Sequence, residues 1–232
     1  MISLTICNQP YTLEKEDNLL KILHEIKTTQ NHTLAYRSGC RSGVCGSCAV
    51  RVNGVEKLAC KTTIKDGDTI EPLKNTTIIK DLVVDLTNQS ISLNMAQAYL
   101  EKKGDAIITT QDEKSIDLQS NCILCNSCYS SCPVYEVNKD FIGPFALTRA
   151  YRYVNDKKEA TIQTKIDRVQ TNGIWDCTLC GNCNMVCPEH IDIKNDIMML
   201  RNKSAQLGYS DPNMANFDMG FSQDFGFNPN GF

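Results

Sequence analysis

The sequence predicts an α+β protein with two domains, a strand-rich domain over residues 1–85 and an all-helical domain over residues 86–207. Three observations support this fold class. Apolar residues alternate with polar ones near the start of the chain, as in half-buried strands, and later recur every three or four positions, as on one face of a helix. Twelve of the 13 cysteines fall into three groups. A tail rich in Phe, Gly and Asn follows over residues 208–232.

The first domain opens with a predicted β-hairpin and a helix. Apolar residues alternate over residues 2–6, and a second strand begins at Tyr11 after a turn at residues 8–10. Asp17 or Asn18 can cap the helix that follows. One apolar stripe on this helix consists of Leu19, Leu20, Ile22, Leu23 and Ile26.

The first cysteine group lies in a glycine-rich stretch after this helix. Cys40, Cys45 and Cys48 follow the spacing C-x4-C-x2-C, and Cys60 lies further along the chain. This is the spacing of plant-type [2Fe–2S] proteins. The three glycines within residues 39–46 let the loop wrap a cluster and leave backbone N–H groups free to donate to sulfur. A glycine-rich turn with free buried cysteines explains neither the spacing nor the four thiols.

Further strands enclose this loop. Residues 49–52 predict a strand, Asn53-Gly54 a hairpin turn, residues 58–60 the start of the return strand, and residues 67–72 a short closing strand. Strands, one helix and further strands around a cluster loop form the β-grasp arrangement of plant-type ferredoxins. Cys7 stands outside every spacing and is interpreted as a small buried apolar residue.

The second and third cysteine groups repeat one motif, C-x2-C-x2-C-x3-C-P, which is the run found in bacterial ferredoxins. Three thiolates of a run face one cubane cluster, and the fourth cysteine ligates the cluster of the other run. The sequence therefore predicts two [4Fe–4S]-type sites with crossed ligands. One set is Cys122, Cys125, Cys128 and Cys187, and the other is Cys132, Cys177, Cys180 and Cys183.

A zinc-stabilised interaction module is the competing interpretation, because zinc ribbons also use C-x2-C pairs. Such ribbons rarely place four cysteines and a proline within twelve residues, and this chain does so twice. A disulfide framework is less expected still, because residues 1–17 show no secretory signal. The net charge of −3 predicts no nucleic-acid surface. No apolar run approaches the about 20 residues that span a bilayer.

The second domain shows helical periodicity. Residues 75–86 are expected to cross between the domains, and the polar residues 105–119 to form a loop. The predicted helices span residues 90–103, 144–156, 161–171 and 193–207.

The tail contains five of the seven phenylalanines: Phe217, Phe221, Phe225, Phe227 and Phe232. Disordered tails are usually poor in aromatic residues, and a phenylalanine buries its area only where something covers it. Two interpretations stand side by side. The tail folds back on its own helical domain, or it docks along a partner chain with the phenylalanines as anchors.

With its three cysteine groups in this order, the chain resembles the iron–sulfur subunit of the fumarate reductase/succinate dehydrogenase family. The resemblance covers residues 1 to about 205 and also rests on residues 38–48 and 141–153. It implies an electron-transfer subunit without catalytic residues, beside a partner flavoprotein that carries FAD and the dicarboxylate site. It further implies a membrane-anchor subunit, where the electrons pass to or from a quinone, a quinol or another carrier, and a peripheral position on the cytoplasmic membrane. The cytoplasmic side is favoured, and export with a partner stays open.

Three positions refine this resemblance. Most family members lack a cysteine where Cys180 stands and hold a [3Fe–4S] third cluster, so [4Fe–4S] is favoured here over [3Fe–4S]. Glu136 and Thr178 match the positions of the tryptophan and histidine associated with quinone in many succinate dehydrogenases. Cys180 resembles the methylmenaquinol- and thiol-linked fumarate reductases, which have a cysteine at this position and an anchor subunit rich in cysteine. His190 follows the family pattern and is expected to be structural. The alternative function is a freestanding ferredoxin-type carrier or the iron–sulfur arm of another flavoenzyme.

Overall fold

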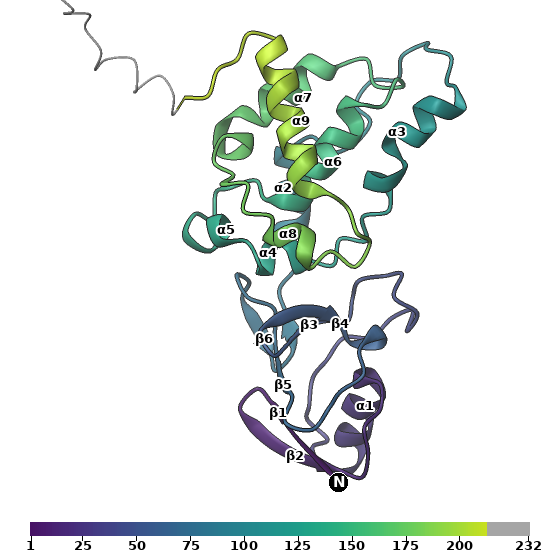
Figure 1. Ribbon diagram of the computed structural model, residues 1–232, viewed down its shortest axis with the longest axis vertical. Helices are drawn as coiled ribbons and strands as arrows, with labels where there is room; N and C mark the ends of the chain where they lie inside the picture. Colours follow the sequence, from purple (N-terminus) through teal and green to yellow (C-terminus); the bar gives the residue numbers. More distant parts are fainter. Residues whose placement is uncertain (213–232) are drawn as a thin grey trace, which may run out of the picture.

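The computed structural model describes residues 1–212, which form a sheet-containing part and a helical part stacked along the long axis of the molecule (Figure 1). Buried apolar side chains form two separate clusters, one within residues 2–84 and the other within residues 96–200. The predicted α+β class, with strands first and helices afterwards, is confirmed. The five tail phenylalanines lie outside the described residues.

The N-terminal part is a five-stranded mixed sheet with one helix packed on it (Figure 1). The strand order is β2-β1-β5-β3-β4, in which β1 pairs parallel with β5 and the other neighbours pair antiparallel. This is the predicted β-grasp arrangement. The strands are β1 (Ile2–Ile6), β2 (Gln9–Leu13), β3 (Ala49–Val52), β4 (Val55–Leu58) and β5 (Thr69–Glu71).

Helix α1 (Leu19–Thr29) buries all five residues of its predicted stripe against the sheet. Asn18 is the N-cap, because its side chain accepts a hydrogen bond from the Leu20 N–H at 3.1 Å. The same amide donates to the main-chain oxygen of Cys60 at 2.9 Å. The start of α1 is therefore joined directly to the segment that carries the last cysteine of the first group.

The first part differs from the sequence prediction at three places. The hairpin turn is the pair Cys7-Asn8, both with positive φ, because Ile6 pairs with Gln9. Strand β4 ends at Leu58, and Cys60 lies in the 3₁₀ turn η1 (Ala59–Lys61) instead of a strand. An unpredicted hairpin, β6 (Ile78–Lys80) and β7 (Val83–Val84), lies on the crossing between the two parts.

The helical part is built around α6 and α9, with the short helices α4 and α8 at the end that faces the sheet (Figure 1). None of the helices within residues 1–212 is long and apolar enough to cross a membrane. The elements are α2 (Asn88–Met95), α3 (Thr110–Ser120), α4 (Ser127–Ser130), α5 (Pro133–Val137), α6 (Pro144–Val154), α7 (Ile162–Arg168), η2 (Gln170–Ile174), α8 (Asn182–Met185) and α9 (Ile193–Gln206).

Helix α3 overturns the prediction of a loop over residues 105–119. The missed signal is a capping box, in which the Thr109 side chain accepts from the Asp112 N–H while the Asp112 carboxylate accepts from the Thr109 N–H. The predicted helix over residues 90–103 is also shorter, since α2 ends at Met95. The helix predicted for residues 161–171 ends at Arg168.

Two buried polar groups tie the helices together. Asp196 on α9 accepts hydrogen bonds from Gln119 on α3 at 2.8 Å and from Thr148 on α6 at 2.9 Å. Burial raises the pKa of Asp196 to about 6, although both hydrogen bonds act in the opposite direction. Lys165 on α7 is fully buried and forms an ion pair with Glu159 at 3.1 Å.

The Lys165 ammonium also donates to the main-chain oxygens of Gln97 at 2.9 Å and Tyr99 at 2.6 Å. Its three donors are therefore all used, which is the condition under which a buried cation is tolerated. Burial alone would raise the pKa of Glu159, but hydrogen bonds from Thr161, from the Glu101 N–H and from Lys165 outweigh it and hold this pKa at about 2. The segment after α2 is thus fixed to α7.

Candidate iron–sulfur sites

The two repeated cysteine runs fold into loops of the same backbone shape. Leu124 and Asn126 have φ values of 53° and 65°, and the corresponding Leu179 and Gly181 have 55° and 83°. Left-handed backbone is uncommon outside glycine, so its recurrence at matching positions shows that both loops curl in the same way. Each loop then enters a one-turn helix, α4 or α8, that carries the third cysteine of its run.

The first cavity collects cysteines from both runs. Phe145, Ile191 and Ile193 contribute its apolar walls. Its four cysteines are Cys122, Cys125, Cys128 and Cys187. These are the four thiols that the crossed pattern assigns to one cluster.

The second cavity also collects cysteines from both runs, and its apolar walls come from Val134, Phe141 and Ile197. Its cysteines are Cys132, Cys177, Cys180 and Cys183. Cys180 lies with the other three, and it is exposed, whereas Cys132 and Cys183 are buried. One corner of this cavity is therefore open to the surface.

Burial shapes the electrostatics of these thiols. It raises the pKa of Cys122 to about 11 and of Cys183 to about 12, and that of the fully buried Cys128 well above its ordinary value. Neutral thiols are poor metal ligands, so cations must supply the charge that keeps these groups as thiolates. Arg149 near Cys122 and Arg201 near Cys177 act in that direction, because each opposes the rise in pKa.

Arg201 was not identified from the sequence. Its guanidinium donates to the main-chain oxygens of Ile174 at 2.8 Å and Cys177 at 2.7 Å, and it lies 5.4 Å from the Trp175 ring. These contacts hold a positive charge beside the start of the second run. Arg201 is on α9, 24 residues from Cys177, so no spacing rule joins the two.

The first cysteine group is organised by backbone donors. The N–H groups of Ser42, Val44 and Cys45 all point at the Cys40 sulfur at 3.3–3.4 Å. These hydrogen bonds, with the one from Ser42 foremost, lower the pKa of Cys40 to about 5 and so favour its thiolate. The Cys45 sulfur in turn accepts from the Cys40 N–H at 3.4 Å. The exposed pair Cys40 and Cys45 is therefore preorganised to bind metal.

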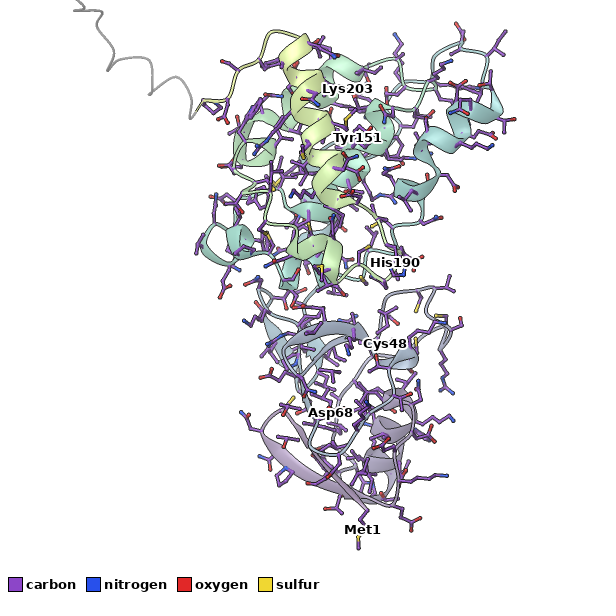
Figure 2. All side chains as sticks on the ribbon, viewed as in Figure 1. Met1, Cys48, Asp68, Tyr151, His190 and Lys203 are labelled. Atoms are coloured by element: carbon purple, nitrogen blue, oxygen red, sulfur yellow. The ribbon has the colours of Figure 1, made fainter. Side chains whose placement is uncertain are left out.

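The other two cysteines of this group are buried beneath the loop. The Cys60 N–H donates to the Cys48 sulfur at 3.5 Å, and burial raises the pKa of Cys48 to about 11. The loop lies at the end of the sheet part nearest the helices, and Cys48 faces the end of the helical part where His190 stands (Figure 2). His190 is exposed, and its N–H donates to the Cys187 oxygen at 3.2 Å.

The donor sets fit iron–sulfur clusters. Each cavity presents four cysteines, and backbone N–H groups donate to sulfur at 3.4 Å in both, from Ile191 to Cys187 and from Tyr135 to Cys132. Within residues 1–212, no three His, Cys, Asp or Glu side chains converge on a single-ion site. Thiolates that surround a cluster are spread over several irons, so they need not converge on one point.

Known proteins share this organisation. The 2Fe-2S iron-sulfur cluster binding domain model matches residues 5–90, and the 4Fe-4S dicluster domain model matches residues 119–191. The fumarate reductase iron-sulfur subunit of Escherichia coli O6:H1 is 39% identical over 185 residues, which cover 75% of this chain and 76% of that protein. The chain belongs to the iron–sulfur subunits of the fumarate reductase/succinate dehydrogenase family.

As a member of this family, the chain is an electron-transferring iron–sulfur subunit, as the sequence predicted. The 8-methylmenaquinol:fumarate reductase iron-sulfur subunit of Wolinella succinogenes is 38% identical over 213 residues, which cover 83% of this chain and 67% of that protein. A chain of the Mycobacterium smegmatis Sdh1 complex in the apo form has the same fold, with a TM-score of 0.80 at 23% identity. That match covers 90% of this chain and 97% of the other.

Proposed function

We propose that the chain conducts electrons through three clusters, between a flavoprotein subunit that carries FAD and the dicarboxylate site and a membrane-anchor subunit. The observation that carries the proposal is the pair of cavities, each lined by three cysteines of one run and the fourth cysteine of the other. Such crossing, in which the fourth cysteine of each run serves the other site, is expected of two-cluster ferredoxins.

The cavities and the cysteine spacings support the following assignment of ligands. Cys40, Cys45, Cys48 and Cys60 hold a [2Fe–2S] cluster. Cys122, Cys125, Cys128 and Cys187 hold a [4Fe–4S] cluster. Cys132, Cys177, Cys180 and Cys183 hold the third cluster. When bound, each cluster takes up and releases one electron at a time. The protein excludes water from the buried sulfurs and donates hydrogen bonds to them, and both effects set the potential.

A [4Fe–4S] third cluster is supported by Cys180, which lines the same cavity as the other three ligands. The exposure of Cys180 makes its corner the place where an iron is most easily lost, which would leave [3Fe–4S]. Cys180 also supports a place beside the methylmenaquinol- and thiol-linked branch of the family, with a cysteine-rich anchor.

The chain itself works as a peripheral subunit at the cytoplasmic membrane, with the cytoplasmic side favoured. We place its domain boundary at residues 85–86, between the two buried clusters. The wider assembly rests on the relatives, which are named as iron-sulfur subunits of fumarate reductases and succinate dehydrogenases.

One anaerobic purification from native membranes tests the proposal. The expected result is about ten irons per chain, from two, four and four, together with a flavin-containing partner. Three reduced-state or oxidised-state EPR signals should account for this iron. Colourless protein that contains zinc would refute the proposal. A brown chain that purifies without a flavoprotein would support the freestanding carrier instead.

A further inference from the structure

The sheet part and the helical part touch at Gly46, the residue that follows Cys45. A β-carbon added at Gly46 would lie 2.8 Å from the Cys125 β-carbon, 2.8 Å from the Ile123 oxygen and 3.0 Å from the Cys125 α-carbon. Ile123 and Cys125 both pack against the core of the sheet part. The loop of the first cysteine group therefore lies directly on the loop of the second, and no side chain of residue 46 separates them.

A left-handed turn is not sufficient to explain this glycine. Gly46 has φ of 69°, but Gly43 and Gly67 have φ of 85° and 81°. A β-carbon at Gly67 would meet nothing within 4 Å, and one at Gly43 would meet only the flexible Lys61 side chain. Among the glycines of residues 39–67, Gly46 is the one that faces backbone of another cysteine run.

Polar contacts keep the two loops from sliding apart. The Ser130 hydroxyl on α4 donates to Glu56 on β4 at 2.6 Å, and it accepts from the Lys74 N–H at 2.8 Å. The Asn75 amide donates to the main-chain oxygen of Tyr129 at 2.9 Å. Helix α4 carries Cys128, so these contacts fix the second cysteine group against the sheet part. A methyl group at residue 46 could not be accommodated by the movement of a flexible side chain.

We propose that Gly46 is a positioning residue for electron transfer, which keeps the [2Fe–2S] site and the site of Cys125 at their closest spacing. Cys45 is the neighbour of Gly46 in the chain, and Cys125 is in contact with it, so a path of bonds and one close contact joins the two ligand sets through Gly46. One electron passes, one site is oxidised as the other is reduced, and no bond is made or broken. The inference rests on the proposed function.

The expected effect of a side chain follows from the contact distances. Real β-carbons essentially never stand closer than 3.0 Å to another heavy atom, and the added β-carbon would stand at 2.8 Å from two of them, so the two loops must shift apart. Both the magnetic interaction between two reduced sites and the rate of electron tunnelling fall steeply with distance. Gly46→Ala should therefore weaken the communication between the sites while each cluster remains.

The test uses the full chain, purified anaerobically with its clusters. Gly46→Ala is compared with Gly67→Ala, which adds similar backbone strain at a position outside the cluster loop where a β-carbon meets nothing within 4 Å. Iron per chain is measured first. The spin relaxation of the reduced [2Fe–2S] signal is then recorded with the neighbouring cube oxidised and reduced. Gly46→Asn and Gly67→Asn repeat the comparison, because asparagine tolerates left-handed backbone.

The proposal predicts full iron in the Gly46 variants, with a measurable decrease in the relaxation enhancement that the reduced cube causes, and wild-type enhancement in the Gly67 variants. Iron-loaded Gly46 variants with unchanged enhancement would overturn it. Loss of the [2Fe–2S] centre from both Gly46 variants would also overturn the proposal, because Gly46 would then be required to form the centre and would not act on its distance from the site of Cys125. A wild-type chain without iron would refute the proposed function as well, so the two failures are distinguishable.

Discussion

The crossed ligand sets predict that the last cysteine of each run binds the cluster of the other run. An assignment of ligands by sequence order alone would predict the opposite. Cys132 closes the first run in the chain, yet it lines the cavity of Cys177, Cys180 and Cys183. Cys187 closes the second run, yet it lines the cavity of the first. Replacing either with alanine removes one of four ligands from a single cluster. We expect Cys132→Ala to lose the third cluster and Cys187→Ala to lose the cluster of the first run.

The magnitude follows from the ligand sets. A cubane cluster that loses one buried thiolate ligand is expected to be lost as a unit, so each variant should fall from about ten irons per chain to about six. Total iron is therefore the same for both variants. Because Cys132 is buried and its sulfur already accepts from the Tyr135 N–H at 3.4 Å, water cannot readily replace this ligand.

A background variant whose third cluster has a distinctive EPR signal allows the two cubane clusters to be distinguished. Cys180→Ser removes the exposed ligand of the third cluster and should convert it to a three-iron form, which has its own EPR signal in the oxidised state. In this background, Cys132→Ala should abolish the marked signal, and Cys187→Ala should keep it. The opposite pattern would refute the crossed assignment.

Cys7→Ala is the matched control. Cys7 lies in the β1–β2 turn, and it packs against the core of the sheet part and lines neither of the two cavities. Its substitution should leave about ten irons per chain and the marked signal unchanged. A loss of iron from Cys7→Ala would show that alanine substitution by itself disturbs cluster assembly.

Three further predictions concern charges. The pKa of Asp196 is about 6, above the ordinary carboxyl value, so its contribution to stability falls as pH rises from about 4 to about 6. Asp196→Asn should flatten this pH dependence and raise the free energy of unfolding at pH 7.5 by roughly 2–3 kcal/mol. Urea unfolding midpoints at about pH 4 and at pH 7.5 measure both effects. A lower midpoint for Asp196→Asn at pH 7.5 would contradict this. Lys165→Met should lower the free energy of unfolding by roughly 3–5 kcal/mol because it leaves Glu159 buried without its cation. Adding Glu159→Gln should recover part of that loss, and a double variant no more stable than Lys165→Met would count against the ion pair. Arg201→Gln should lower the reduction potential of the third cluster by roughly 40 mV, for a charge interaction of about 1 kcal/mol, whereas Arg201→Lys should leave this potential unchanged. If a redox titration gave the same potential for Arg201→Gln and the wild type, the charge of Arg201 would not act on the site of Cys177.

Some secondary-structure elements of this protein could be predicted because the residues that determine them lie close together in the sequence. The helix α1 follows from the Asn18 cap and an apolar stripe, and both are set within one stretch of chain. Helix α3 was missed because its apolar period is weak, although its capping box at Thr109 and Asp112 was present in the sequence. The position of the return strand was missed too, since Cys60 lies in a 3₁₀ turn that no propensity distinguishes from a strand end.

The twelve cysteines and their grouping were determined by the sequence alone, because the reach of a loop around a cluster depends on the number of residues between ligands. Contacts between distant residues depended on the tertiary structure. Arg201 reaches Cys177 from another helix, and Gly46 meets Cys125 across the boundary between the two parts. No spacing rule relates residues that far apart, because packing of the sheet part on the helical part decides which loops touch.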